Sequence, residues 1–307
     1  MAPQVFVITG PTATGKTRLG VELALKANGE VVSADSMQIY KYMDIGTAKP
    51  ERDELRGVPH HMIDVVPPWE DYSVSRYVEE AANKIDDILA RGKLPIIVGG
   101  TGLYIDSLLS GRFFADRGES GVREELERMY DETGGERMLE KLAEFDGESA
   151  ARLHANDKRR ILRAFEIFKE TGLTVTEHNE RTRAVPLRYD AVKLVLNYRS
   201  REALYARIDA RVDEMLRLGL KTETEAVLRM GAKPENTAMQ AIGYKEMAKF
   251  LAGECGENEA VDRIKQESRR YAKRQLSWLR RDERAVWLEW EKTPDFDFAL
   301  HVSTNYL

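Results

Sequence analysis

From Val5 to Thr17 the chain reads Val5-Phe-Val-Ile-Thr-Gly10-Pro-Thr-Ala-Thr-Gly15-Lys16-Thr17, and this stretch indicates the fold class. The apolar run Val5–Ile8 is typical of a buried strand, and the segment from Lys16 to Lys26 reads as the helix that follows it. Between them, Gly-x-x-x-x-Gly-Lys-Thr is the pattern of a phosphate loop. Its glycines let backbone N–H groups turn toward phosphate oxygens, and the helix start adds its positive dipole end. The sequence therefore predicts an α/β core that binds a polyphosphate.

The loop predicts a ligand but no reaction. Lys16 supplies a positive charge, and the hydroxyl of Thr17 can ligate Mg²⁺, which is the expected cofactor. Taken alone, the loop favours a small-molecule kinase or another NTPase. The predicted phosphate-binding residues are Gly10, Pro11, Thr12, Ala13, Thr14, Gly15, Lys16 and Thr17.

Further apolar runs at intervals continue the α/β pattern. Strands are expected from Val31 to near Asp35, over Pro95–Val98 and over Ala191–Leu196, with a helix over Val74–Ala90. Strands that alternate with helices predict a parallel sheet with helices on its faces. The expected fold class is therefore α/β, with a P-loop NTPase-like parallel sheet flanked by helices.

Residues 116–186 interrupt this alternation. They are highly charged and have helical periodicity, for example at Ile161, Leu162, Phe165 and Phe168. We expect a helical insertion here, so that residues 1–115 and 187–307 together form the core. After residue 200 the pattern is nearly all helical.

Composition limits the class of protein. The 307 residues carry a net charge of −5, yet residues 262–285 hold 9 basic and 4 acidic side chains, so positive charge is concentrated late in the chain. No apolar run is long enough to span a bilayer. A single cysteine excludes an internal disulfide and favours the cytoplasm. Paired histidines, His60 and His61, have no carboxylate or cysteine at ligand spacing, so they are expected to be structural.

Two polar residues follow expected strands. Asp35 ends the second strand and Thr101 follows the third, after Gly99-Gly100. Ligands of open parallel sheets bind outside the carboxyl ends of the strands, so Asp35, Thr101 and the phosphate loop should converge on one crevice. The carboxylate of Asp35 could serve there as a general base, as a magnesium ligand through water, or as a helix cap.

Several segments together resemble the bacterial tRNA dimethylallyltransferase (IPP transferase) family. The resemblance spans residues 4 to about 290. Besides the phosphate loop, the segments that carry it are Asp35–Gln38, Asp44–Pro50, His60–His61, Gly99–Tyr104, Gly243–Tyr244 and Lys273–Arg280.

The resemblance implies a prenyl transfer. The phosphate loop would hold the diphosphate of dimethylallyl diphosphate, and the acceptor would be the exocyclic amine of the adenosine 3′ of the anticodon in tRNA. Asp35 matches the general base and Thr101 matches a residue near the same reacting centre. Arg211 matches an arginine near the diphosphate, although Arg207 lies on the same helix face and could take that place.

The resemblance also implies an RNA surface on an expected monomer. Each basic cluster could instead be an ordinary solvated helix face with no RNA-binding role. A P-loop kinase and a nucleic-acid-binding NTP sensor remain the competing functions. The expected contacts with the tRNA anticodon stem-loop are Asp35, Ser36, Met37, Gln38, Thr101, Arg159, Arg160, Ile161, Leu162, Arg163, Gln240, Gly243, Tyr244, Lys245, Lys273, Arg274, Gln275 and Arg280.

Overall fold

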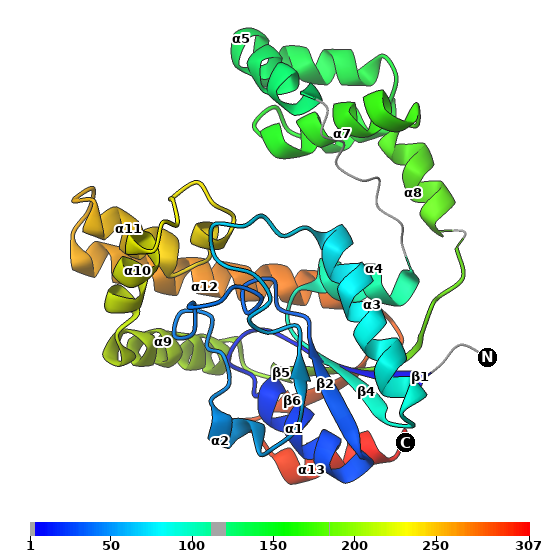
Figure 1. The fold of residues 1–307 in the computed structure, drawn as a ribbon, viewed down its shortest axis with the longest axis vertical. Helices are drawn as coiled ribbons and strands as arrows, with labels where there is room; N and C mark the ends of the chain where they lie inside the picture. The colour runs from blue at the N-terminus through cyan, green and yellow to red at the C-terminus, as the bar shows by residue number, and fades with distance from the viewer. Residues whose placement is uncertain (1–3, 112–120, 184) are drawn as a thin grey trace. The chain divides into compact units, whose positions relative to one another are not determined.

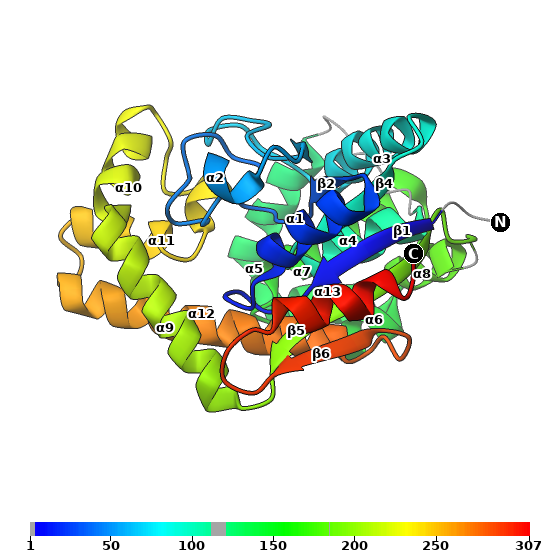
Figure 2. The same cartoon turned by 90° about the horizontal axis from the view of Figure 1, so that it is seen from below.

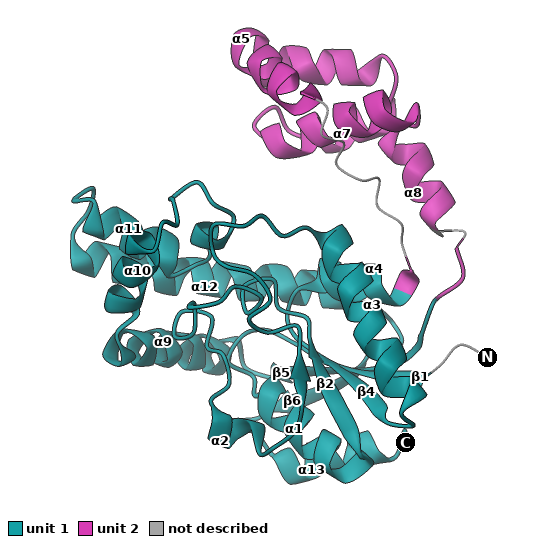
Figure 3. Ribbon diagram, in the orientation of Figure 1, with its two compact units in different colours: residues 1–109, 188–307 teal, residues 110–187 magenta. Residues whose placement is uncertain are grey.

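The chain divides into two compact units (Figure 3). A computed structural model describes residues 4–111, 121–183 and 185–307. Unit 1 comprises Met1–Leu109 and Arg188–Leu307, and unit 2 is Ser110–Leu187. The chain thus leaves unit 1 once and returns to it, which is the connectivity expected for an insertion. Residues 116–120 of the expected insertion lie outside the described residues.

The described part of unit 1 contains a six-stranded sheet in the order β3-β2-β4-β1-β5-β6 (Figure 1). All neighbouring strands are parallel. This confirms the predicted α/β fold with a parallel sheet. The strands are β1 Gln4–Thr9, β2 Gly29–Ser33, β3 His60–His61, β4 Leu94–Val98, β5 Asp190–Tyr198 and β6 Val286–Trp290.

Helices cover the sheet and extend beyond its edge (Figures 1 and 2). Helices α1 and α13 pack against each other, and α3 packs on β2 and β4. The helices that begin in unit 1 are α1 Lys16–Ala27, α2 Arg52–Leu55, α3 Val74–Ala90, α4 Gly102–Ser110, α9 Arg201–Leu218, α10 Leu220–Arg229, α11 Tyr244–Leu251, α12 Glu257–Leu279 and α13 Phe296–Thr304, with a short 3-10 turn at Ala238–Gln240.

Helix α3 begins and ends at the predicted residues. The hydroxyl of Ser73 accepts a hydrogen bond from the backbone N–H of Arg76 at 3.1 Å, which caps the first turn. Tyr77, Ala81, Ile85 and Ile88 recur at helical spacing and are all fully buried. The serine cap and the apolar stripe are both features of the local sequence, and both indicate a helix here.

Two strands are not those expected. We predicted helices after residue 200, but Val286–Trp290 forms β6, an edge strand paired with β5. Strand β3 consists of His60 and His61, which pair with Val31 and Val32. Both are short, and each becomes a strand through its neighbour in the sheet rather than through a pattern of its own.

The carboxyl ends of β1, β2 and β4 lie at one edge of the sheet. Ile8 is paired with Val98, and Val98 with Ser33, so the loops that follow these three residues start side by side. These loops are the phosphate loop, the segment that contains Asp35 and the segment that contains Thr101. The sheet therefore places the predicted site residues at one edge.

Unit 2 is helical in its described part. Gly134, with φ 80°, kinks the first helix, α5. Residues Leu126 and Leu142 of this helix pack on Ile161 and Phe165 of α7 in a separate core. The helices are α5 Val122–Ala143, α6 Gly147–Arg152, α7 Lys158–Thr171 and α8 Val175–Arg183.

Candidate active site

The phosphate loop has a backbone that two of its glycines make possible. Gly10 has φ 143°, and a Cβ on it would lie 2.2 Å from the carbonyl oxygen of Leu196. Gly15 has φ 90° and caps α1, and a Cβ on it would lie 2.5 Å from the ring of Phe296. A side chain at either position would strain the backbone and collide with a neighbour. The first backbone N–H groups of α1 have no partner within the helix, so they are available to an anion.

Lys16 lies inside the loop. Its Nζ donates to the carbonyl oxygen of Pro11 at 2.7 Å. Burial, followed by the positive charge of Arg211, lowers the pKa of Lys16 to about 7, whereas the carboxylate of Asp35 acts in the opposite direction. Lys16, Arg211 and Asp35 are therefore close enough to interact through their charges.

Asp35 caps a turn with one carboxylate oxygen. Its Oδ1 accepts from the N–H of Met37 at 2.9 Å and from that of Gln38 at 3.4 Å. The segment after it is a turn rather than a helix, so the expected alternative of a helix cap is replaced by a turn cap. These bonds use only Oδ1, which leaves Oδ2 for chemistry.

Thr101 is hydrogen-bonded to the same turn. Its Oγ1 accepts from the N–H of Ser36 at 3.0 Å and lies 3.3 Å from the Ser36 hydroxyl, and its own N–H donates to the carbonyl of Ala34 at 3.1 Å. The predicted convergence of Asp35 and Thr101 is therefore present in the structure.

Arg211, rather than Arg207, faces these groups. Arg207 is exposed on α9, whereas Arg211 is partly buried. Burial lowers the pKa of Arg211, and the negative charge of Asp35 opposes this shift. Its buried Nε has no hydrogen-bond partner within the described residues. A guanidinium with an unused donor beside Lys16 is suited to an anionic ligand.

Helix α12 supports both loops. The Oε1 of Gln275 accepts from the N–H of Thr12 at 3.3 Å, and its Nε2 donates to the carbonyl of Gly100 at 2.9 Å. Tyr271, one turn earlier, lies close enough to Thr101 and Gln275 to interact with both; burial and the charge of Asp35 raise the pKa of Tyr271 to about 12. Sequence reasoning missed Tyr271. Its i, i+4 spacing to Gln275 was the available signal that the two share a helix face.

Burial removes several side chains from the predicted RNA surface. Ile161 and Leu162 are fully buried in the core of unit 2, and Tyr244 is fully buried in unit 1. Gln275 is 7% exposed, and its amide is already bound to the two loops. Gly243 is buried where it caps α11. These side chains are therefore not exposed for direct contact with RNA in this structure, and contact between these segments and the tRNA stays a prediction.

The other two glutamines of the predicted surface, Gln38 and Gln240, are bound to nearby backbone. Nε2 of Gln38 donates to the carbonyls of Thr47 and Ala48, each at 3.3 Å, and Gln240 donates to the carbonyl of Pro234 at 2.7 Å. Base contacts by either amide would require these bonds to exchange.

The basic side chains themselves are mostly exposed. Arg163 is the exception, since it is partly buried and donates to Glu166 at 3.2 Å. The exposed members of the predicted set are Arg159 and Arg160 on α7, Lys245 on α11, and Lys273, Arg274 and Arg280 on or next to α12.

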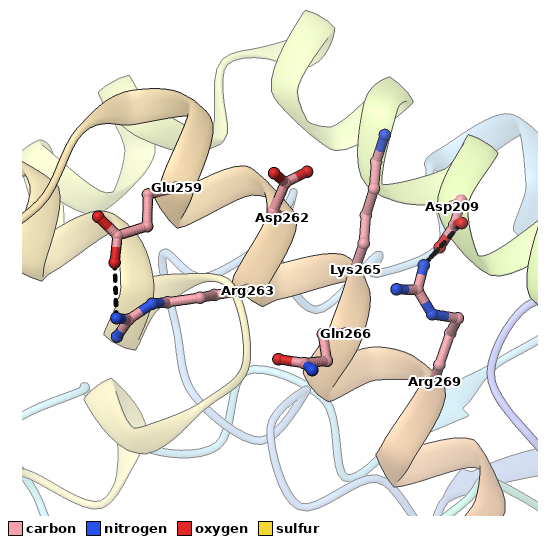
Figure 4. A pocket seen from close by; sticks show the side chains of 7 residues that line it. All are labelled: Asp209, Glu259, Asp262, Arg263, Lys265, Gln266 and Arg269. Carbon is pink, nitrogen blue, oxygen red and sulfur yellow. Dashed lines mark hydrogen bonds and ion pairs between the residues drawn. The ribbon is translucent and has the colours of Figure 1, made fainter.

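A surface pocket between α9 and α12 lies apart from these residues (Figure 4). Apart from Asp262, its charged side chains pair with one another or with neighbours: Arg269 with Asp209, Arg263 with Glu259, and Lys265 with Asp213. None of the predicted phosphate-binding or catalytic residues lines it. Because its three cations are all paired, it offers little to an anionic ligand.

The histidines have structural partners. His60 Nδ1 lies 2.9 Å from the carbonyl of Val58, and His61 Nε2 lies 2.8 Å from Glu30. The buried Glu30 also binds Arg91 and Lys93, and Arg91 contributes most to lowering the pKa of its carboxyl. No group of three or more potential metal ligands from His, Cys, Asp and Glu occurs in the described ranges. The hydrogen-bond partners of His60 and His61 agree with the structural interpretation of the pair.

No helix in the described part of the chain is long and apolar enough to cross a membrane. The family model "IPP transferase" matches residues 38–282, and "Isopentenyl transferase" matches residues 3–65. Residues 283–307, which include β6 and α13, lie beyond both matches.

Relatives and solved structures agree with these matches. The chain is 48% identical over 290 residues to a tRNA dimethylallyltransferase of Caldanaerobacter subterraneus, covering 94% of this chain and 92% of that protein. A tRNA isopentenylpyrophosphate transferase from Bacillus halodurans superimposes with a TM-score of 0.74 at 39% identity, covering 100% of this chain and 95% of that one. A eukaryotic dimethylallyltransferase acting on tRNA gives a TM-score of 0.85 at 31% identity, covering 99% of this chain and 79% of that one.

Proposed function

The chain belongs to the IPP transferase family, and on that premise we propose that it moves a dimethylallyl group from dimethylallyl diphosphate to tRNA. The acceptor is the exocyclic amine of the adenosine 3′ of the anticodon. The observation that most directly supports this function is the mutual charge interaction of Lys16, Arg211 and Asp35 at one edge of the sheet. Two cations suited to a leaving diphosphate, beside one carboxylate suited to accept a proton, support the proposal.

The reaction needs a base and a charge sink. The amine nitrogen forms a bond to C1 of the dimethylallyl group while the bond from C1 to the diphosphate oxygen breaks. Oδ2 of Asp35 takes the proton that the amine loses, and Oδ1 stays bound to the turn and fixes the orientation of the carboxylate. Lys16 and Arg211 stabilise the negative charge that grows on the diphosphate. Thr101 orients the Asp35 turn through Ser36.

Mg²⁺ fits this site with few protein ligands. It usually keeps several waters and binds substrate phosphates together with one or two protein groups. The partly buried hydroxyl of Thr17 follows Lys16 in the loop and makes no hydrogen bond within the described residues, so it is free to be that group. When bound, the ion would add positive charge at the departing diphosphate.

The exposed cations supply the tRNA contacts in this proposal. Arg159 and Arg160 on unit 2, with Lys273, Arg274 and Arg280 on unit 1, would meet backbone phosphates. The acceptor base is in a single-stranded loop, from which it can be extruded at a cost of a few kcal/mol. A monomer in the cytoplasm, where its tRNA substrate is found, stays our prediction.

Labelled donors test the proposal against the kinase alternative. The chain is incubated with bulk tRNA and either dimethylallyl diphosphate labelled in the prenyl group or ATP labelled in the γ-phosphate. We expect label in tRNA from the first donor only, and loss of that transfer in Lys16→Ala. Phosphate transfer from ATP, or prenyl transfer that survives in Lys16→Ala, would contradict the assignment of the loop.

A further inference from the structure

The C-terminal segment reaches the phosphate loop from outside the residues that the family models match. The Nε1–H of Trp290, the last residue of β6, donates to the carbonyl oxygen of Thr14 at 3.0 Å. Trp290 is 2% exposed, so this hydrogen bond is shielded from water. The ring of Phe296, the first residue of α13, fills the space where Gly15 has no Cβ.

Three side chains form a stack behind the loop. The rings of Trp290 and Phe296 have centroids 5.8 Å apart, and the guanidinium of Arg18 lies 4.3 Å from the centroid of Phe296. Arg18 belongs to the first turn of α1, whereas the two aromatic residues lie more than 270 positions later. The stack therefore joins the end of the chain to the residues that bracket the loop.

The hydrogen bond to Thr14 controls which way one loop peptide points. In a trans peptide the carbonyl of one residue and the N–H of the next point in opposite directions. With the Thr14 carbonyl held on Trp290, the N–H of Gly15 points away from β6, and it makes no hydrogen bond within the described residues. Without the indole N–H, the buried carbonyl would have no partner, and rotation of the peptide would turn an oxygen toward a bound anion.

We propose that Trp290 and Phe296 are positioning residues for the diphosphate: they hold the Thr14–Gly15 peptide with its N–H directed at the donor. The proposal rests on the assignment of the loop to the diphosphate. It makes the end of the chain a determinant of donor affinity, although neither residue belongs to the phosphate-loop pattern.

Pyrophosphate binding in the presence of Mg²⁺, measured by calorimetry on the full chain, tests this. Trp290→Phe keeps an aromatic ring but removes the N–H, and we expect about tenfold weaker binding, an equal reduction of kcat/KM for dimethylallyl diphosphate, and unchanged affinity for tRNA. The matched control is Trp287→Phe on the same strand, because the indole of Trp287 makes no hydrogen bond within the described residues. We expect it to bind as wild type does.

A second pair of variants keeps the proposal testable if the Trp290 variant does not fold. Phe296→Ala removes the ring that backs Gly15, whereas Phe298→Ala removes a ring that is 55% exposed on the same helix. Weaker pyrophosphate binding in Phe296→Ala alone supports the proposal. Wild-type pyrophosphate binding in a folded variant, even one with a lower melting temperature, would mean that the residue it replaces only packs behind the loop. Wild-type binding in both folded Trp290→Phe and folded Phe296→Ala would overturn the proposal.

Lys16→Ala distinguishes a wrong positioning role for Trp290 from a wrong assignment of the loop to the diphosphate. If Lys16→Ala binds pyrophosphate weakly while Trp290→Phe binds it normally, the loop assignment stands and the positioning role is wrong. If Lys16→Ala binds as wild type does, the loop does not hold the diphosphate, and both proposals are wrong.

Discussion

The amine of Lys16 and the guanidinium of Arg211 are both partly buried and interact through their charges. Burial is the main reason that the pKa of Lys16 falls to about 7, and the charge of Arg211 adds to it. Burial also lowers the pKa of Arg211. Asp35 compensates both cations only in part, so a bound anion would relieve their repulsion.

Binding of pyrophosphate should therefore take up a proton. An anion between the two cations raises the pKa of Lys16, because it favours the charged form. Above about pH 7 the free lysine is increasingly neutral, so affinity should be full below that pH and should fall as the pH rises toward the higher pKa of the complex. Calorimetry at about pH 8, in buffers of different ionisation enthalpy, measures the uptake.

Lys16→Arg is the control for this prediction. A guanidinium stays charged throughout this pH range, so the proton uptake that is due to Lys16 should be absent in Lys16→Arg. Protonation of pyrophosphate itself is common to both proteins and cancels in the comparison. Equal uptake by wild type and Lys16→Arg would mean that Lys16 is already charged in the free enzyme.

Arg211 and Arg207 offer a matched pair one turn apart. Arg211→Gln should lower kcat by roughly 10²–10³-fold, because a cation that stabilises developing charge is removed. It should also raise the pKa of Lys16, since one of the causes that lower it disappears. Arg207→Gln removes an exposed charge and should change kcat little. Steady-state kinetics with both variants decides which arginine acts; a larger defect in Arg207→Gln would reverse the assignment.

Two substitutions of Asp35 separate its proposed proton transfer from its turn cap. Asn retains an Oδ1 that can accept from Met37 and Gln38, so Asp35→Asn should keep the fold and tRNA affinity while turnover falls by roughly 10²–10⁴-fold. Asp35→Ala removes both roles and should also lower the melting temperature. If Asp35→Asn turns over almost normally and only Asp35→Ala is impaired, the carboxylate is a cap and another group takes the proton.

Local patterns predicted the parts of the fold that local sequence controls. Helix α3 has its own cap and apolar stripe, and β1 is a buried apolar run after its first residue, so both were predictable. Strand β6 alternates only weakly and follows a long basic helix, and it is a strand because β5 pairs with it. Nothing in the neighbouring sequence specifies that partner.

Site residues that belong to a sequence motif or follow a strand were predictable, whereas residues that reach the site from distant parts of the chain were not. The spacing of the phosphate loop identified Lys16, and strand ends identified Asp35 and Thr101. The difference in exposure favours Arg211 over Arg207, a distinction that spacing could not make because the two residues share a helix face. Trp290 contacts Thr14 across 276 positions, and such a contact leaves no local pattern.

The cations of unit 2 give a quantitative test of RNA binding. Arg159 and Arg160 are exposed and make no ion pair within the described residues, whereas Arg163 is bonded to Glu166 and is left in place. Neutralising Arg159 and Arg160 to Gln should weaken tRNA binding. It should lower the slope of log affinity against log salt by about 0.7–0.9 for each phosphate that an arginine no longer neutralises.

Arg137 and Arg152 provide the control on the same unit. Both are exposed and paired, with Glu140 and Glu148 respectively, so changing them to Gln alters the net charge equally without removing a free cation. We expect tRNA affinity and slope to change less than in the Arg159/Arg160 variant, and pyrophosphate affinity to be unchanged in both, since the phosphate loop belongs to unit 1. Equal reductions in the two double variants would mean that unit 2 acts only through its overall charge. An unchanged slope in the first would leave Lys273, Arg274 and Arg280 to bind the phosphates alone.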